Sequence, residues 1–159
     1  MKKYEFTGET KEIKLLFRTA VLHRIRATVS FGFVKIGDLG GWIEKEENLS
    51  HEGKAWVWGN AKVWGNAKVC GDAEVFSASH VLVIGAIGSR NDFTTFYRDK
   101  DNEITVKCGC FLGKIDRFLE KVTQTHGDSK YALVYRAAVE VAKLQIDLSG
   151  EALKDADEE

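Results

Sequence analysis

The most regular feature of the chain is a six-residue pattern of glycine, alanine and valine between residues 53 and 82. A period of six is neither the 3.6-residue period of a helix nor the strict alternation of a long strand. It predicts a short strand followed by a corner, with alanine and valine buried and glycine at a corner that requires positive φ. The matching residues are Val57, Val63, Val69, Val75 and Val81, then Ala55, Ala61, Ala67 and Ala73, and then Gly53, Gly59, Gly65 and Gly71.

Three such hexads would make one triangular coil, and stacked coils would bury a continuous column of side chains. The Gly-Asn-Ala-x-Val-x form of the repeat, seen at 59–64 and 65–70, resembles the hexapeptide-repeat left-handed β-helix family. Ile43 and Leu49 continue the six-residue step upstream, towards Ala55. The pattern therefore predicts a short left-handed β-helix.

The segments on either side of the repeat have other hydrophobic patterns. Strand-forming residues before the repeat predict an N-terminal β cap, and apolar runs at 93–97 and 104–108 around a turn predict a hairpin. Two amphipathic helices are expected to follow, with one face made of Ile115, Phe118, Leu119 and Val122 and the other of Tyr131, Val134, Tyr135, Ala138 and Val141. The predicted fold is mainly β: the cap at 1–36, the left-handed β-helix at 37–88, and a ββαα tail at 89–159 with a disordered acidic end.

The residue after each valine is usually large and apolar, and in a coil it would point outward. These positions are Trp58, Trp64, Phe76 and Leu82. Apolar surface of this extent is normally covered. The cover would be the chain's own C-terminal segment, a second subunit or an aromatic ligand, and we assign the four residues to a candidate homo-oligomer interface.

Charge and composition exclude some classes of function. The 23 basic and 24 acidic residues leave a net charge of −1, so nucleic-acid binding is not expected. No apolar run reaches the roughly 20 residues that span a bilayer, so no membrane association is expected. Three cysteines, an odd number, fit a reducing compartment. The expected location is the cytoplasm.

Histidines and cysteines offer little catalytic chemistry. His23, His51, His80 and His126 lack the spacing of a metal site on stacked coils, so neither a metal nor a cofactor is predicted. His80 lies within the repeat and is interpreted as a surface histidine, although it would be the base if the chain were an acyltransferase. Cys108-Gly-Cys110 is interpreted as a strand that buries two thiols. No catalytic residue is assigned.

A polar cluster follows the repeat at Ser89-Arg90-Asn91-Asp92. The guanidinium of Arg90 suits phosphate or carboxylate, and neighbouring hydroxyls suit an anion or nucleotide. The candidate ligand-binding residues are Ser89, Arg90, Asp92, Thr94, Thr95, Lys107, His126 and Tyr131. In the competing interpretation, Arg90 and Asp92 pair with each other and only stabilise the hairpin.

A wider resemblance covers most of the chain. The strings 37–43, 87–92 and 108–111, together with His126-Gly127 and the repeats, are similar to small hexapeptide-repeat proteins of phages and mobile elements, described as putative-transferase-like or polymer-forming-like. No activity is carried over from that family, but a phage origin implies host takeover or evasion of bacterial immunity.

The sequence therefore predicts a non-enzymatic, oligomeric binding protein. Its expected role is that of a phage-type anti-defence factor that sequesters a nucleotide-derived signal or blocks a host defence protein. An acyltransferase of the hexapeptide class and a structural self-assembling protein are the alternatives.

Overall fold

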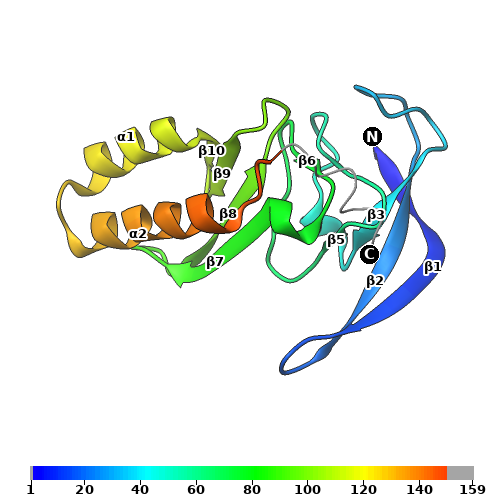
Figure 1. The fold of residues 1–159 in the computed structure, drawn as a ribbon, viewed down its shortest axis with the longest axis horizontal. Helices are drawn as coiled ribbons and strands as arrows, with labels where there is room; N and C mark the ends of the chain where they lie inside the picture. Colours follow the sequence, from blue (N-terminus) through cyan, green and yellow to red (C-terminus); the bar gives the residue numbers. More distant parts are fainter. Residues whose placement is uncertain (1, 150–159) are drawn as a thin grey trace.

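The computed structural model describes residues 2–149, which form ten strands, two α-helices and two 3-10 turns (Figure 1). The strands are β1 (Tyr4–Lys14), β2 (Thr19–Ala27), β3 (Leu39–Ile43), β4 (Trp56–Val57), β5 (Lys62–Val63), β6 (Glu74–Val75), β7 (Val81–Ile87), β8 (Asp92–Arg98), β9 (Ile104–Cys108) and β10 (Phe111–Lys114). The α-helices are α1 (Ile115–His126) and α2 (Lys130–Gln145), and the 3-10 turns are Glu46–Asn48 and Ala78–His80. The predicted mainly β content and the two C-terminal helices are confirmed.

An N-terminal sheet has the strand order β1-β2-β3-β5. β1 and β2 form an antiparallel hairpin that projects beyond the body of the molecule, which confirms the strands expected before the repeat (Figure 1). β3 then pairs in parallel with β5. The close approach of β3 to the segment before β5 requires glycine at position 41, because a Cβ there would clash with the carbonyl oxygen of Ala61.

The repeat segment buries the predicted side chains, but it does not form a left-handed β-helix. The buried residues are Ala55, Ala61, Ala67, Ala73, Val57, Val63, Val69 and Val75, and the four corner glycines have positive φ. The strands of the segment are only two residues long. β5 joins the otherwise antiparallel N-terminal sheet, and β4 and β6 pair in parallel as a separate sheet of two strands. The left-handed β-helix prediction is therefore wrong. The six-residue period sets which side chains point inward, but such short strands do not extend into continuous stacked sheets.

The C-terminal half is an antiparallel sheet of order β10-β9-β8-β7 with both helices against one face (Figure 1). This confirms the predicted hairpin, β8 with β9, and both helices. The helices and the sheet share one hydrophobic core that includes Phe96, Val106, Phe118, Tyr135 and Val139.

Two details of this half differ from the predictions. β7 was assigned to the end of the repeat, but it pairs antiparallel with β8 and is an edge strand of the C-terminal sheet. The buried face of α2 is also displaced, since Ala132, Val139 and Ala142 are buried whereas Tyr131 and Val141 are exposed. The face moves because α2 packs against both the sheet and α1.

The end of the described chain returns towards the repeat, where the amide of Asp147 donates to the carbonyl oxygen of Ser79 at 3.1 Å. The acidic end that was expected to be disordered lies outside the described residues. Within residues 2–149, no helix is long and apolar enough to cross a membrane.

Candidate functional site

A pocket of about 200 Å³ lies at one end of the C-terminal sheet. Its walls are the turn between β7 and β8, the turn between β9 and β10, and the C-terminal half of α1. The polar lining is Ser89, Arg90, Asp92, Thr94, Cys108, Cys110, Lys121, Thr125, His126 and Tyr135, and the apolar lining includes Phe111, Phe118 and Val122.

Two turns with positive φ shape the pocket. Gly88 has φ +77°, and a Cβ there would lie 1.8 Å from the hydroxyl oxygen of Tyr135, so only glycine lets the β7–β8 turn lie against α2. Asn91 in the same turn has φ 48°, a conformation that asparagine tolerates. Gly109 forms the second turn, where a Cβ would lie 3.6 Å from a guanidinium nitrogen of Arg90. Arg90 therefore lies over the β9–β10 turn at the rim.

Arg90 and Asp92 do not pair with each other. Asp92 accepts a hydrogen bond from the backbone amide of Phe93 at 2.7 Å, and no ion pair of Arg90 is found within residues 2–149. The structure therefore does not show the alternative in which the Arg90 and Asp92 side chains pair to stabilise the hairpin. The guanidinium at the rim keeps its capacity for a ligand.

The inner part of the pocket is aromatic. Phe118 lies edge-on to Tyr135 at 5.7 Å between ring centroids, and Phe111 lies 5.5 Å from Phe118. His126 stacks on Tyr135 at 5.7 Å. Burial raises the pKa of Tyr135 above its usual range, and the neighbouring Cys108 adds to the effect. Tyr135 therefore keeps its proton at neutral pH, with its hydroxyl hydrogen-bonded to Cys108.

The structure brings together five of the eight predicted ligand-binding residues: Ser89, Arg90, Asp92, Thr94 and His126. The other three lie elsewhere. The hydroxyl of Thr95 accepts a hydrogen bond from the Lys68 amide, on the side of the repeat. Lys107 lines a different groove, and Tyr131 is exposed with its ring 5.8 Å from that of His126. Neighbours on a strand point to opposite faces, which separates Thr94 from Thr95.

The sequence reasoning missed the residues that the helices supply. Lys121 and Thr125 are four apart on α1 and share the face that turns to the pocket. The amphipathic pattern of this helix could have predicted both residues, because polar residues beside an apolar stripe lie at the border of the buried face. Tyr135 was predicted as core, and it also lines the pocket.

The two nearby cysteines do not form the predicted buried pair. Gly109 has φ +57°, so the chain turns between them, and Cys108 pairs directly with Phe111 across the turn. Cys110 is exposed at the tip, whereas Cys108 accepts a hydrogen bond from the Thr94 hydroxyl at 3.4 Å. The strand interpretation failed because it did not allow for a glycine turn at this position.

The predicted interface residues pack mostly within the chain. Trp58 stacks on the buried Phe76 with centroids 5.4 Å apart. Trp64 packs beside Trp42 and the N-terminal hairpin, and Leu82 packs in the C-terminal core. The chain itself therefore supplies much of the cover for these side chains, and their role between subunits stays a prediction.

His80 is fully buried, and its Nδ1 accepts a hydrogen bond from the backbone amide of Phe76 at 3.0 Å. The prediction of a surface histidine is wrong, because the residue closes the 3-10 turn Ala78–His80 from inside. In the part of the chain that the structure describes, no three histidine, cysteine, aspartate or glutamate side chains are grouped as metal ligands would be.

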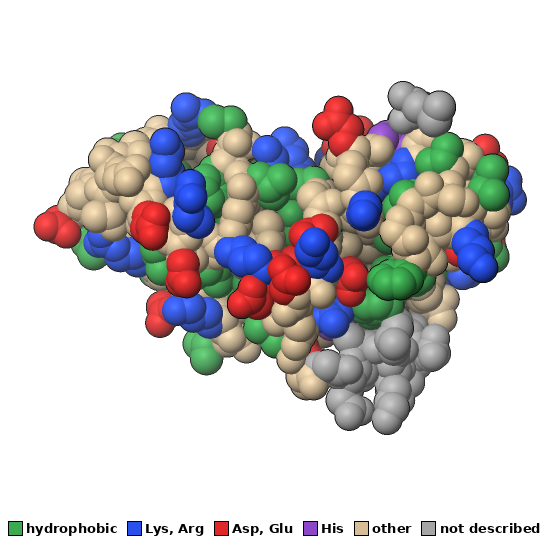
Figure 2. Space-filling model, turned by 90° about the horizontal axis from the view of Figure 1, so that it is seen from above, with side chains coloured by type: hydrophobic (Ala, Val, Ile, Leu, Met, Phe, Trp, Pro, Cys, Tyr) green, Lys and Arg blue, Asp and Glu red, His purple; other side chains and the backbone are tan. Residues whose placement is uncertain are grey.

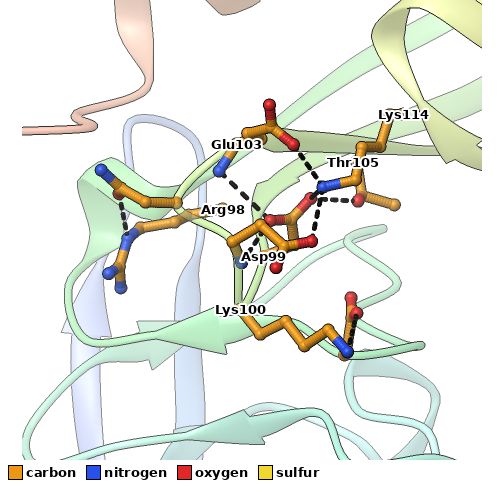
Figure 3. Close-up of polar contacts among 9 residues, drawn as sticks. Arg98, Asp99, Lys100, Glu103, Thr105 and Lys114 are labelled. Atoms are coloured by element: carbon orange, nitrogen blue, oxygen red, sulfur yellow. Dashed lines mark hydrogen bonds and ion pairs between the residues drawn. The ribbon is translucent and has the colours of Figure 1, made fainter.

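The most elaborate polar network lies around Asp99 rather than at the pocket (Figure 3). Asp99 is fully buried and accepts hydrogen bonds from the backbone amides of Asp101 and Glu103, the hydroxyl of Thr105 and the ammonium of Lys114. With every acceptor used, the network stabilises the β8–β9 turn and leaves no group for a ligand.

Basic and acidic side chains are interspersed over the face seen in Figure 2. No single-sign patch dominates that face, so attraction of an anion to the pocket depends on the local side chains there. No protein-family model matches the chain, and no curated protein matches it. The resemblance to phage hexapeptide-repeat proteins thus stays a prediction from the motifs that suggested it.

Proposed function

We propose that the protein is a non-enzymatic, oligomeric binding protein that holds a small nucleotide-derived anion in the pocket beside Arg90. The observation that carries the proposal is a guanidinium without an ion-pair partner in residues 2–149, placed at the rim of an aromatic pocket. In a phage-type role, the protein would sequester this signal in the cytoplasm of a bacterial host.

The lining suits a ligand with a charged end and a planar end. Arg90, Lys121 and His126 supply nitrogen donors at the opening, and the hydroxyls of Ser89, Thr94 and Thr125 supply neutral partners. Phosphate binds well to such a set, because guanidinium donors match its oxygen atoms in pairs. Phe111, Phe118 and Tyr135 supply aromatic rings against which a base can pack.

Binding a host defence protein is the second candidate. Large apolar side chains are exposed on the N-terminal hairpin and its neighbouring loop, with Phe17 93% exposed and Phe33 88% exposed. Exposed aromatic side chains of this kind are enriched where proteins meet. The acyltransferase alternative has less support, since His80, its proposed base, is fully buried.

The test is to analyse the purified full-length protein by native mass spectrometry and then release any bound molecule by denaturation. Titration calorimetry follows with the four ribonucleoside monophosphates as probes. We expect binding of at least one probe, and Arg90→Ala should weaken it about 30-fold, since a charged hydrogen bond contributes roughly 2 kcal/mol.

Arg117→Ala is the matched control, because Arg117 is an exposed arginine of α1 that does not line the pocket. It should leave affinity unchanged, and both variants should melt within a few degrees of the wild type. The proposal fails if no probe binds and no molecule is released, or if Arg90→Ala binds like the wild type. A large loss of stability in Arg90→Ala would instead assign Arg90 to the stability of the hairpin.

A further inference from the structure

The outer edge of β7 has no hydrogen-bonded neighbour in residues 2–149, because β7 ends the order β10-β9-β8-β7. In Figure 1 the strand forms the lower border of the helix-bearing half. Its sequence, Val-Leu-Val-Ile-Gly-Ala-Ile, contains no charged residue and no proline. Edge strands of monomeric proteins are normally protected by charge, proline, shortness or a bulge. β7 has no charge or proline and is seven residues long, and its register shift lies between Ile84 and Ile87, so Val81–Ile84 form a regular, unprotected edge.

The other sheet edges differ from β7, and those formed by β4, β5 and β6 are only two residues long. β1 is longer, but Glu5, Glu9, Lys11, Glu12 and Lys14 distribute charge along it. β10 is only four residues long and ends at Lys114. A strand that pairs antiparallel with its own copy places like residues near one another, so charge on β1 would repel whereas β7 carries none. An uncharged edge therefore suits a second copy of this chain.

A second unpartnered surface lies next to β7, on α2. Leu133, Ala137, Val141 and Leu144 follow helical spacing and lie opposite the buried residues of the helix. Leu144 is 89% exposed, Leu133 60% and Val141 47%. Because α2 packs on β7 while α1 packs on β9 and β10, α2 is the helix nearest the open edge.

Strand spacing and helix spacing are compatible with a single dimer interface. Two helices cover four strands here, so each helix occupies the width of two strands, about 10 Å. Helices pack at interaxial distances of about 8–10 Å. A two-fold axis beside β7 would therefore continue the sheet and, in the same step, place α2 against α2 of the second copy.

We propose that two copies of this chain associate through antiparallel pairing of β7 with β7 and packing of the α2 surface formed by Leu133, Ala137, Val141 and Leu144. The interface is isologous and closed, which limits assembly to a dimer at this edge. The inference names a surface for the oligomer of the proposed function. It does not depend on the ligand, so mass and ligand binding are separate readouts.

The test compares masses by size-exclusion chromatography with light scattering on the full chain. The wild type should have twice the monomer mass of 17.8 kDa. The double variant Val141→Lys, Leu144→Lys should raise the dissociation constant at least about 100-fold, because like charges facing each other across an interface cost several kcal/mol. Lysine is a good helix former, so the variant should keep its fold, and the helical circular dichroism verifies this.

Phe17→Lys is the control, since Phe17 is equally exposed but lies at the tip of the N-terminal hairpin, and it should remain dimeric. Hydrogen exchange then examines the strand. The amides of Val81–Ile84, the regular part of β7, should exchange slowly in the wild type and faster in the monomeric double variant. A wild type that stays monomeric at roughly 100 μM overturns the proposal, as does a dimer that the double variant leaves intact or β7 amides that exchange equally in both.

Discussion

In the half of the molecule that contains the repeats, alanine and valine are buried at a regular six-residue step, whereas the half with the helices buries its side chains at irregular intervals. The first arrangement stacks small side chains along the repeat, with the rings of Tyr4, Trp56 and Tyr97 packed around them. The second leaves the pocket between Phe111, Phe118 and Tyr135. The irregular packing of the helical half thus leaves an aromatic pocket with polar groups at its rim, which is the combination that a small ligand needs.

The two halves also differ in how they surround a lysine ammonium. Lys3 is buried at the repeat, where its ammonium donates to the carbonyl oxygens of Ala55 and Gly53. Burial lowers its pKa to about 8. Burial alone would also lower the pKa of Lys114, but hydrogen bonds to Asp101, Glu103 and Asp99 raise it above the usual range. Carbonyl oxygens leave the Lys3 charge poorly compensated, and carboxylates compensate Lys114 fully.

The largest predicted effect comes from Val69→Asp in the repeat. Val69 is 1% exposed, so the variant places an unpaired carboxylate in the apolar interior and should lose at least about 4 kcal/mol of unfolding free energy. All four tryptophans, Trp42, Trp56, Trp58 and Trp64, lie in the repeat half and both α-helices in the other. Urea unfolding followed by tryptophan fluorescence and by ellipticity at about 222 nm therefore reports on each half.

The outcome shows whether the two halves unfold as one unit or separately. If both signals are lost together, the halves form one cooperative unit. If the ellipticity survives, the helical half folds without the repeat. Lys68→Asp, the exposed neighbour, should change stability by less than about 0.5 kcal/mol. A Val69→Asp protein as stable as the wild type would contradict the burial on which the comparison depends.

The sequence pattern was most informative where it was periodic. It predicted which alanines and valines are buried, because a side chain's direction follows from local spacing. It did not predict how the strands assemble, since β3 pairs with both β2 and β5, and such pairing depends on residues far apart in the chain. Only part of the candidate site could be predicted, because local sequence does not show which distant residues meet. Ser89 to Thr94 are contiguous, whereas Lys121 and Tyr135 reach the pocket only through helix packing.

A smaller loss is expected for Asp99→Ala, at the junction of the two halves. Asp99 bridges to Ala73 of the repeat through the backbone and organises the β8–β9 turn through its side chain. Its removal leaves the Thr105 hydroxyl and two buried amides without their acceptor and takes one of three carboxylates from Lys114, so stability should fall by about 3 kcal/mol.

Asp101→Ala is the control in the urea experiment. Asp101 contacts the same lysine, but its side chain is half exposed, so its loss should cost less than about 1 kcal/mol. Equal losses in the two variants would show that burial of Asp99 contributes nothing. A loss in Asp99→Ala confined to the ellipticity signal would show that the junction stabilises the helical half alone.

The smallest effect is a change with pH and concerns Lys3. The pKa of Lys3 falls from 10.5 to about 8 on folding, so the unfolded chain binds more protons between these values, and stability should rise with pH across that window. Between pH values of about 7 and 9.5 the wild type should gain about 2 kcal/mol relative to Lys3→Met, which has no charge to lose. Comparing the variants at each pH cancels the titration of the shared groups that do not interact with Lys3. A difference that stays constant with pH would mean that the Lys3 ammonium is as well solvated in the folded protein as in the unfolded chain, and the contrast with Lys114 would then be wrong.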